Sequence, residues 1–136
     1  MKMLLSLLCL ISFKYSFGQG IEKCQILKEI MEDTTARQVY KLYRNPNVPV
    51  VFFDKMAFFD GCNDKILTER ITQVVRDTTS INKASNYRVI VFVQSKRNSR
   101  YLIEVYSERT HGFAAAQVKE TSGKFYILSK RYGILD

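Results

Sequence analysis

Residues 87–108 read YRVIVFVQSKRNSRYLIEVYSE and hold the clearest strand pattern in the chain. The first eight residues are apolar on both faces apart from Arg88, which predicts a central strand. Residues 101–108 alternate: one face carries Tyr101, Ile103 and Val105, and the other carries Leu102, Glu104, Tyr106 and Glu108. The turn signal KRNS between the two runs predicts an antiparallel hairpin.

Strand patterns continue on both sides of this hairpin. Residues 112–120, GFAAAQVKE, and 124–132, KFYILSKRY, are separated by the turn signals THG and TSG, which predicts a four-stranded antiparallel meander. Upstream, residues 48–54 read VPVVFFD and supply a candidate fifth strand. Pro49 would stand at a sheet edge or among the first residues of that strand.

The preceding residues carry helical patterns. In 21–31, Ile21, Cys24, Leu27 and Met31 recur at helical spacing. A second short helix over 34–43 would be capped by Asp33 or Thr34, and a third is predicted over 63–77 from its stripe of Leu67, Ile71, Val74 and Val75. These elements predict an α+β protein, with N-terminal helices packed on one face of a curved antiparallel sheet of four to five strands.

This order of elements is similar in outline to the cystatin-like and nuclear-transport-factor-2-like folds, in which helices lie in the concavity of a bent sheet. The resemblance rests on element order alone. Because these folds host both enzymes and binding modules, it implies an architecture and no particular activity.

The N-terminus predicts export. Lys2 precedes an apolar run over 4–13, and Ser16 and Gly18 are small residues suited to cleavage after Gly18, so 1–18 reads as a secretory signal peptide. The run is too short to span a bilayer. We therefore expect a periplasmic or secreted protein that does not span a membrane. Its single α+β domain would cover 19–136 and, after loss of Lys2 and Lys14 from 21 basic residues, carry 19 basic and 13 acidic residues.

Two cysteines remain after this cleavage, Cys24 and Cys62. An even number in an exported protein favours a disulfide, worth roughly 3–4 kcal/mol on a chain-entropy argument. The alternative is a pair of buried free thiols. Two distant cysteines and one histidine are too few to predict a metal site, and no motif for a cofactor is present.

One group of residues has the chemistry of a catalytic site. Glu104 and Glu108 share a strand face, and His111 follows in the next turn. If that face lay under the helices, Glu104 would be a partly buried carboxylate, a group suited to general acid–base catalysis in a small hydrolase or isomerase. Alternatively, the two glutamates face solvent and His111 is a turn residue beside Gly112.

Positive charge gathers in the second half of the chain. From Tyr87 onward there are nine basic and four acidic residues, and Lys96, Arg97 and Arg100 crowd one hairpin tip. With Tyr106, these three residues form a candidate binding site for an envelope or extracellular protein or for an anionic surface. Export argues against nucleic acid. The leading hypothesis is therefore a non-catalytic binding domain, with ordinary solubilising charge as the alternative interpretation of the basic residues.

Overall fold

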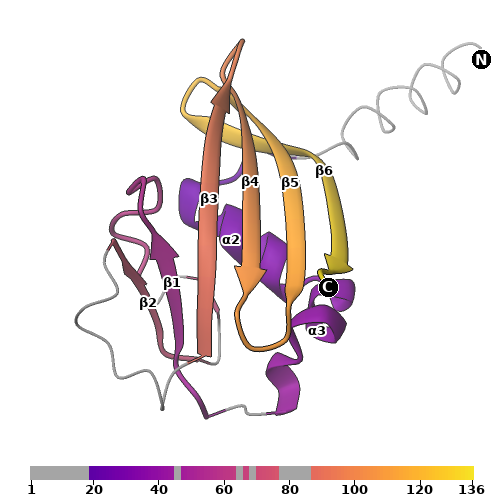
Figure 1. Ribbon diagram of the computed structural model, residues 1–136. Helices are drawn as coiled ribbons and strands as arrows, with labels where there is room; N and C mark the ends of the chain where they lie inside the picture. Colours follow the sequence, from indigo (N-terminus) through magenta and orange to yellow (C-terminus); the bar gives the residue numbers. More distant parts are fainter. Residues whose placement is uncertain (1–18, 45–46, 64–65, 68–69, 77–86) are drawn as a thin grey trace, which may run out of the picture.

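The computed structural model describes residues 19–44, 47–63, 66–67, 70–76 and 87–136. The predicted signal peptide, 1–18, lies outside the described residues. The elements are helices α2 (Lys23–Glu32) and α3 (Thr34–Tyr40), the 3₁₀ helix η1 (Leu42–Arg44), and strands β1 (Val50–Asp54), β2 (Thr72–Val75), β3 (Tyr87–Lys96), β4 (Arg100–Ser107), β5 (Gly112–Thr121) and β6 (Lys124–Ile134). The strands form one sheet in the order β2-β1-β3-β4-β5-β6 (Figure 1).

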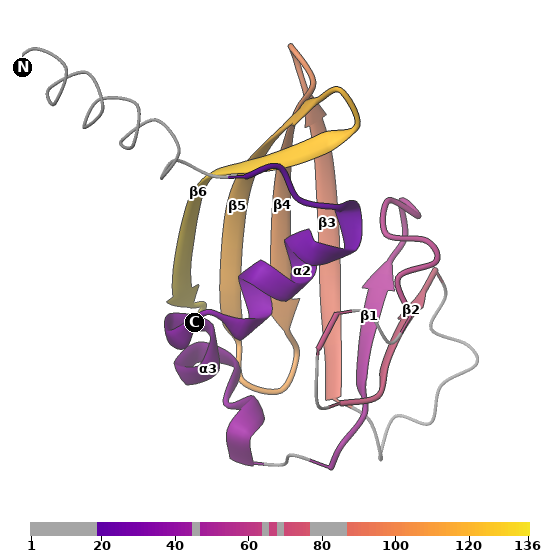
Figure 2. The same cartoon turned by 180° about the vertical axis from the view of Figure 1, so that it is seen from behind.

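The α+β architecture and the arrangement of its layers agree with the sequence-based prediction. Helix α2 crosses one face of a curved sheet and α3 lies near the lower ends of β5 and β6 (Figure 2). We call the opposite side, which none of the described helices covers, the open face. Within the described ranges, no helix is long and apolar enough to cross a membrane.

Local signals position the two helices. The Gln25 side chain accepts a hydrogen bond from the backbone N–H of Glu22, 2.8 Å away, at the start of α2. The Asp33 carboxylate caps α3 by accepting from Thr35 N–H at 2.9 Å, as predicted. It also accepts from Lys130 Nζ at 3.0 Å, and this bond lowers the pKa of Asp33. The helix pair is therefore attached to β6 through Lys130.

The core fills the space between the helices and the sheet. The apolar stripe of α2 is buried and comprises Ile26, Leu27, Ile30 and Met31. Opposite lie alternate residues of the strands, among them Val89, Val91, Ile103, Val105, Ala114, Ala116 and Val118. Because Ala114 and Ala116 are buried on this face, the alanine run is explained by close packing under the helices.

A disulfide links the first helix to the segment after β1. Cys24 and Cys62 are bonded, with their Cα atoms 5.4 Å apart and a sequence separation of 38 residues. Cys62 is 1% exposed and belongs to the core. The predicted pairing is confirmed.

The predicted helix over 63–77 is wrong. Of its described residues, Thr72–Val75 form β2, which runs parallel to β1, and the remainder is non-helical. The physical reason is that Ile71, Val74 and Val75 are β-branched and suit a strand. Pairing with β1 also satisfies backbone groups that would otherwise be left at the edge of that strand.

The sheet is consequently larger than predicted and is mixed. β1 lies between β2 and β3 and is parallel to both, whereas β3–β6 form the predicted antiparallel meander. Pro49 stands immediately before β1, where its carbonyl accepts from Tyr87 N–H at 2.9 Å. Because Pro49 precedes the strand, its lack of a backbone N–H removes no hydrogen bond between β1 and its neighbours. β1 can therefore be an inner strand.

Candidate functional site

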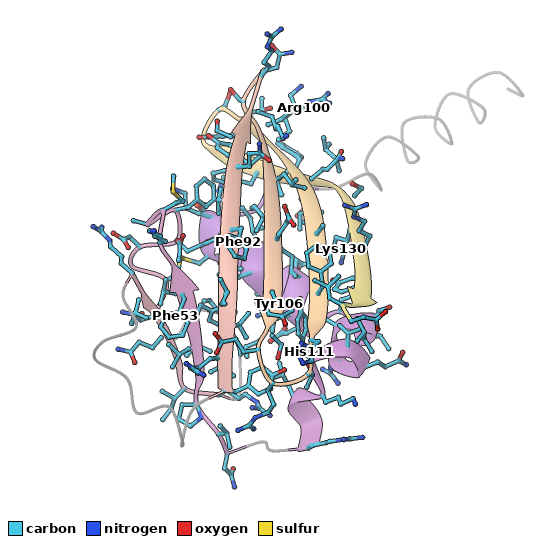
Figure 3. All side chains as sticks on the ribbon, in the orientation of Figure 1. Phe53, Phe92, Arg100, Tyr106, His111 and Lys130 are labelled. Atoms are coloured by element: carbon cyan, nitrogen blue, oxygen red, sulfur yellow. A yellow bond between two sulfur atoms is a disulfide. The ribbon has the colours of Figure 1, made fainter. Side chains whose placement is uncertain are left out.

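The open face is organised as rows of side chains that run across the strands. Ile103 and Val105 of β4 point into the core, so Leu102, Glu104 and Tyr106 between them point to the open face. Figure 3 shows Phe92 and Tyr106 on this side of the sheet, with Arg100 at the hairpin end. Of the sequence-predicted residues, Lys96, Arg100, Glu104 and Tyr106 belong to strands of this face. Arg97, Glu108 and His111 lie in the adjoining turns.

The hairpin end of the open face carries a row of three cations. In register, Lys96 of β3 pairs with Arg100 of β4, and Arg100 pairs with Lys119 of β5. All three side chains are exposed, as is Arg97 in the turn. We call Lys96, Arg100 and Lys119 the cation row. The sequence indicated Lys96, Arg97 and Arg100, but Lys119 was missed because only strand register brings it beside them.

The turn that carries Arg97 has a defined backbone. Asn98 and Ser99 have φ angles of 61° and 54°, in the left-handed region. Ser99 C=O accepts from Glu120 N–H at 2.8 Å, which fastens the turn to β5. The basic tip is thus held by three strands, and Figure 1 shows this hairpin projecting beyond the rest of the sheet.

Among the described residues, the cation row has no acidic partner. Within the described part of the chain, ion pairs join Arg76 to Asp60, Arg88 to Glu108, Lys124 to Glu22 and Lys130 to Asp33. None involves the row or Arg97. Neighbouring strands are about 5 Å apart, and like charges directly opposite one another destabilise a sheet. The row therefore lowers the stability of the unbound protein.

Tyr106 lies on the same face but away from these cations. Its hydroxyl is 2.6 Å from Nδ1 of His111, near the other end of the sheet. Along the paired strand β3, its neighbour Ile90 is six residues from Lys96, a separation of about 20 Å. The structure brings Lys96, Arg97 and Arg100 together and does not bring Tyr106 to them.

The three residues of the catalytic hypothesis are also spread out. Glu104 is on the open face between Phe92 and Ala115 of the adjacent strands, and it does not lie under the helices. Glu108 forms an ion pair with Arg88 at 2.8 Å, and the His111 ring is hydrogen-bonded to the Tyr106 hydroxyl. In the described ranges no hydrogen bond joins these three residues to one another. The geometry assembles no acid–base pair from them.

His111 has a structural role in the turn between β4 and β5. Its φ angle is 59°, its N–H donates to Ser107 C=O at 2.9 Å, and its C=O accepts from Leu135 N–H at 2.9 Å. The interpretation of His111 as a turn residue is the one that these contacts favour. Beside this turn lies a buried hydroxyl pair that sequence reasoning missed. Tyr87 at the start of β3 and Ser107 at the end of β4 have their hydroxyl oxygens 2.7 Å apart.

A buried carboxyl at the end of β1 was also missed. Asp54 is fully buried, and its Oδ2 accepts from Phe59 N–H at 2.6 Å, which shapes the loop that inserts Phe59 into the core. Burial raises the pKa of Asp54 above its ordinary value of 3.8. Its other oxygen has no hydrogen-bond partner among the described residues. The described residues contain no group of three histidine, cysteine or acidic side chains placed to hold a metal ion.

Asp54→Asn is expected to remove a pH dependence of stability. If folding raises the pKa of a carboxyl, the native state loses stability with rising pH. The loss occurs between the pKa of the group in the unfolded chain and its pKa in the folded protein. The variant lacks this loss, so its free energy of unfolding should increase relative to that of wild type as pH rises above the ordinary carboxyl pKa of 3.8. Urea unfolding at several pH values measures the difference. A difference that does not change with pH would contradict the expectation.

A polar hollow of about 270 Å³ lies between α2 and β6. It is lined by Lys28, Glu29, Glu32, Asp33 and Lys130. Because Asp33 and Lys130 pair with each other there, part of its charge is already neutralised. The cation row is therefore the better candidate for binding a charged partner.

No protein-family model, curated protein or solved structure matches this chain. The resemblance to the cystatin-like and nuclear-transport-factor-2-like folds thus remains one of element order, and the parallel β2-β1-β3 part departs from the predicted all-antiparallel sheet. Function therefore has to be inferred from the chemistry of the open face itself.

Proposed function

We propose that this protein is a small exported binding domain without catalytic activity, and that it binds a negatively charged partner through the hairpin end of its open face. The observation that carries the proposal is the cation row, three exposed cations in direct register with no acidic partner among the described residues. The partner would be an envelope or extracellular protein or an anionic surface.

Two features support an exported location. The disulfide between Cys24 and Cys62 is typical of proteins from oxidising compartments. The pattern of residues 1–18 predicts a signal peptide, whose removal leaves a domain of net charge +6, from 19 basic and 13 acidic residues. A basic protein outside the cytoplasm meets anionic lipids, glycans and acidic proteins as its nearest partners.

Repulsion within the row favours binding. An anionic group placed over Lys96, Arg100 and Lys119 interacts with all three and also offsets their mutual repulsion. The guanidinium of Arg100, at the centre, presents several N–H groups in a plane that matches the oxygens of a carboxylate, phosphate or sulfate. Because the row stands at the end of a projecting hairpin, a partner reaches it without rearrangement of the sheet.

Neutralising the row is expected to abolish salt-sensitive binding to an anionic matrix. The variant is K96Q/R100Q/K119Q in the mature protein, applied to a heparin column at low ionic strength. Wild type should be retained and then released as salt screens the charges, whereas the variant should pass through. The matched control, R37Q/R44Q/K55Q, loses the same charge from exposed residues outside the row and should stay close to wild type. Equal elution of the two variants would show that net charge alone is responsible.

The same row variant is expected to be more stable than wild type. Removing two like-charged cross-strand pairs should raise the free energy of unfolding by about 0.5–1.5 kcal/mol. The control R37Q/R44Q/K55Q should change it by less than about 0.5 kcal/mol, as is usual for surface substitutions. Urea unfolding at low salt measures both values. A row variant that is less stable than wild type would contradict the idea that the row is held at a cost in stability.

A further inference from the structure

An apolar row crosses all six strands of the open face near its middle. In register, its members are Val75, Phe53, Ile90, Tyr106, Phe113 and Gly133. None of these residues is charged. The solvent face of an antiparallel sheet normally carries polar side chains, so an apolar row on a face without a covering helix indicates a surface that is covered when the protein functions.

The next row toward the hairpin adds Phe92 and Ala115 to this apolar surface, and it also contains Glu104 and Arg131. Phe92 is 56% exposed, one of the large hydrophobic side chains most open to solvent. It stands in register with Glu104, and Glu104 with Ala115. Val51, Phe53 and Ala115 are buried and yet lie outside the core under the helices, which shows that the open face has packing of its own. Phe92 is the most accessible point of this packing.

The charge distribution determines which occupant fits. A second copy of this chain would bring a second cation row and a second net charge of +6 to the interface, so self-association through this face is opposed by repulsion. An anionic glycan would satisfy the cation row and leave the apolar surface uncovered. A bilayer would require apolar side chains at the projecting tip, and that tip consists of Arg97, Asn98 and Ser99.

We propose that the open face docks an amphipathic protein segment whose apolar side chains cover Phe92 and the apolar row and whose acidic side chains reach the cation row. This inference rests on the proposed function and names the partner's chemistry. The two parts of the face are about 20 Å apart along β3, from Ile90 to Lys96. A helix of about 13 residues spans that distance, with an apolar portion at one end and an acidic portion at the other.

The test selects partner segments from random sequences. Peptides of about 16 residues, displayed on phage, are selected on the mature wild-type protein. Enriched peptides are synthesised, and their Kd is measured for wild type, Phe92→Gln, K96Q/R100Q/K119Q and the control Met56→Gln. Met56 is 69% exposed and lies in the loop after β1, so its replacement removes an exposed apolar side chain outside these rows.

The expected result is enrichment of peptides that combine acidic and apolar residues. Their affinity should fall about tenfold or more in Phe92→Gln and in the row variant, and stay unchanged in Met56→Gln. The inference would be overturned if the enriched peptides were purely acidic and bound Phe92→Gln as tightly as wild type. A selection that enriches no peptides would overturn it as well. Cosedimentation with vesicles containing anionic phospholipid that is lost in Phe92→Gln would also overturn it in favour of a membrane. The heparin column tests the proposed function separately. That function fails if the row variant K96Q/R100Q/K119Q is retained as strongly as wild type.

Discussion

Replacing Cys24 and Cys62 together with alanine is expected to lower the free energy of unfolding by about 4 kcal/mol. The bond closes a loop with a sequence separation of 38 residues, and opening it restores the conformational freedom of that loop to the unfolded chain. The loss also has a local component, because Cys62 is 1% exposed within the core. Since a small domain has only about 5–15 kcal/mol in total, this is a large fraction of its stability.

Denaturant unfolding of the double variant beside oxidised and reduced wild type measures the effect. Reduced wild type should resemble the variant, because both lack the cross-link. Agreement of all three proteins within about 1 kcal/mol would mean that the cross-link contributes little. Mass mapping with and without reductant checks that the bond is present in the starting protein.

Gly112→Ala is expected to destabilise the protein by about 3 kcal/mol or more. A Cβ at this position would lie 2.3 Å from the carbonyl oxygen of Val39 and 2.7 Å from its carbonyl carbon, near the end of α3. Both are backbone atoms, so no rotation of a side chain relieves the clash. Thr110, in the turn before β5, also holds α3 close to Gly112, because its hydroxyl donates a hydrogen bond to Val39 C=O at 2.9 Å. The helix must therefore move, or the start of β5 must.

The chain offers a matched control for this substitution. Gly133 lies on the neighbouring strand β6 and has open space where a Cβ would be placed. Gly133→Ala should change the free energy of unfolding by less than about 1 kcal/mol. Thermal unfolding of both variants compares them directly. Equal effects would show that α3 does not dock against Gly112 as closely as described.

The parts of the fold that the sequence predicted are those with a strong local period. Helix α2 and the strands β3–β6 have patterns that agree with their burial, and Asp33 is a local cap that depends only on neighbouring residues. The disulfide was predictable from the number of cysteines together with the predicted signal peptide. Each of these predictions uses only the residues of one element and its neighbours, or the number of cysteines.

The errors lie where tertiary pairing decides the structure. Residues 72–75 form a short strand only because β1 offers a free edge in parallel register, and the helical stripe in the same residues indicated a competing period. The parallel placement of β1 beside β3 is likewise a long-range choice. No pattern within 48–54 distinguishes an inner strand from an outer one.

The candidate site was predicted in part for the same reason. Lys96, Arg97 and Arg100 are neighbours in sequence, so their grouping was visible. Lys119 joins them through the register of β4 and β5, and the apolar row depends on register across six strands. Tyr106 and Glu104 were assigned to the correct strand face, but alternation alone does not say which face the helices cover.

Nuclear magnetic resonance can show whether the cation row binds negatively charged partners. Uniformly ¹⁵N-labelled mature protein is titrated with low-molecular-mass heparin at low salt. The largest amide shift changes should fall on Lys96, Arg97, Arg100 and Lys119, and these changes should disappear when salt is raised. Shift changes spread evenly over exposed lysines and arginines of the helices and the sheet would contradict this expectation.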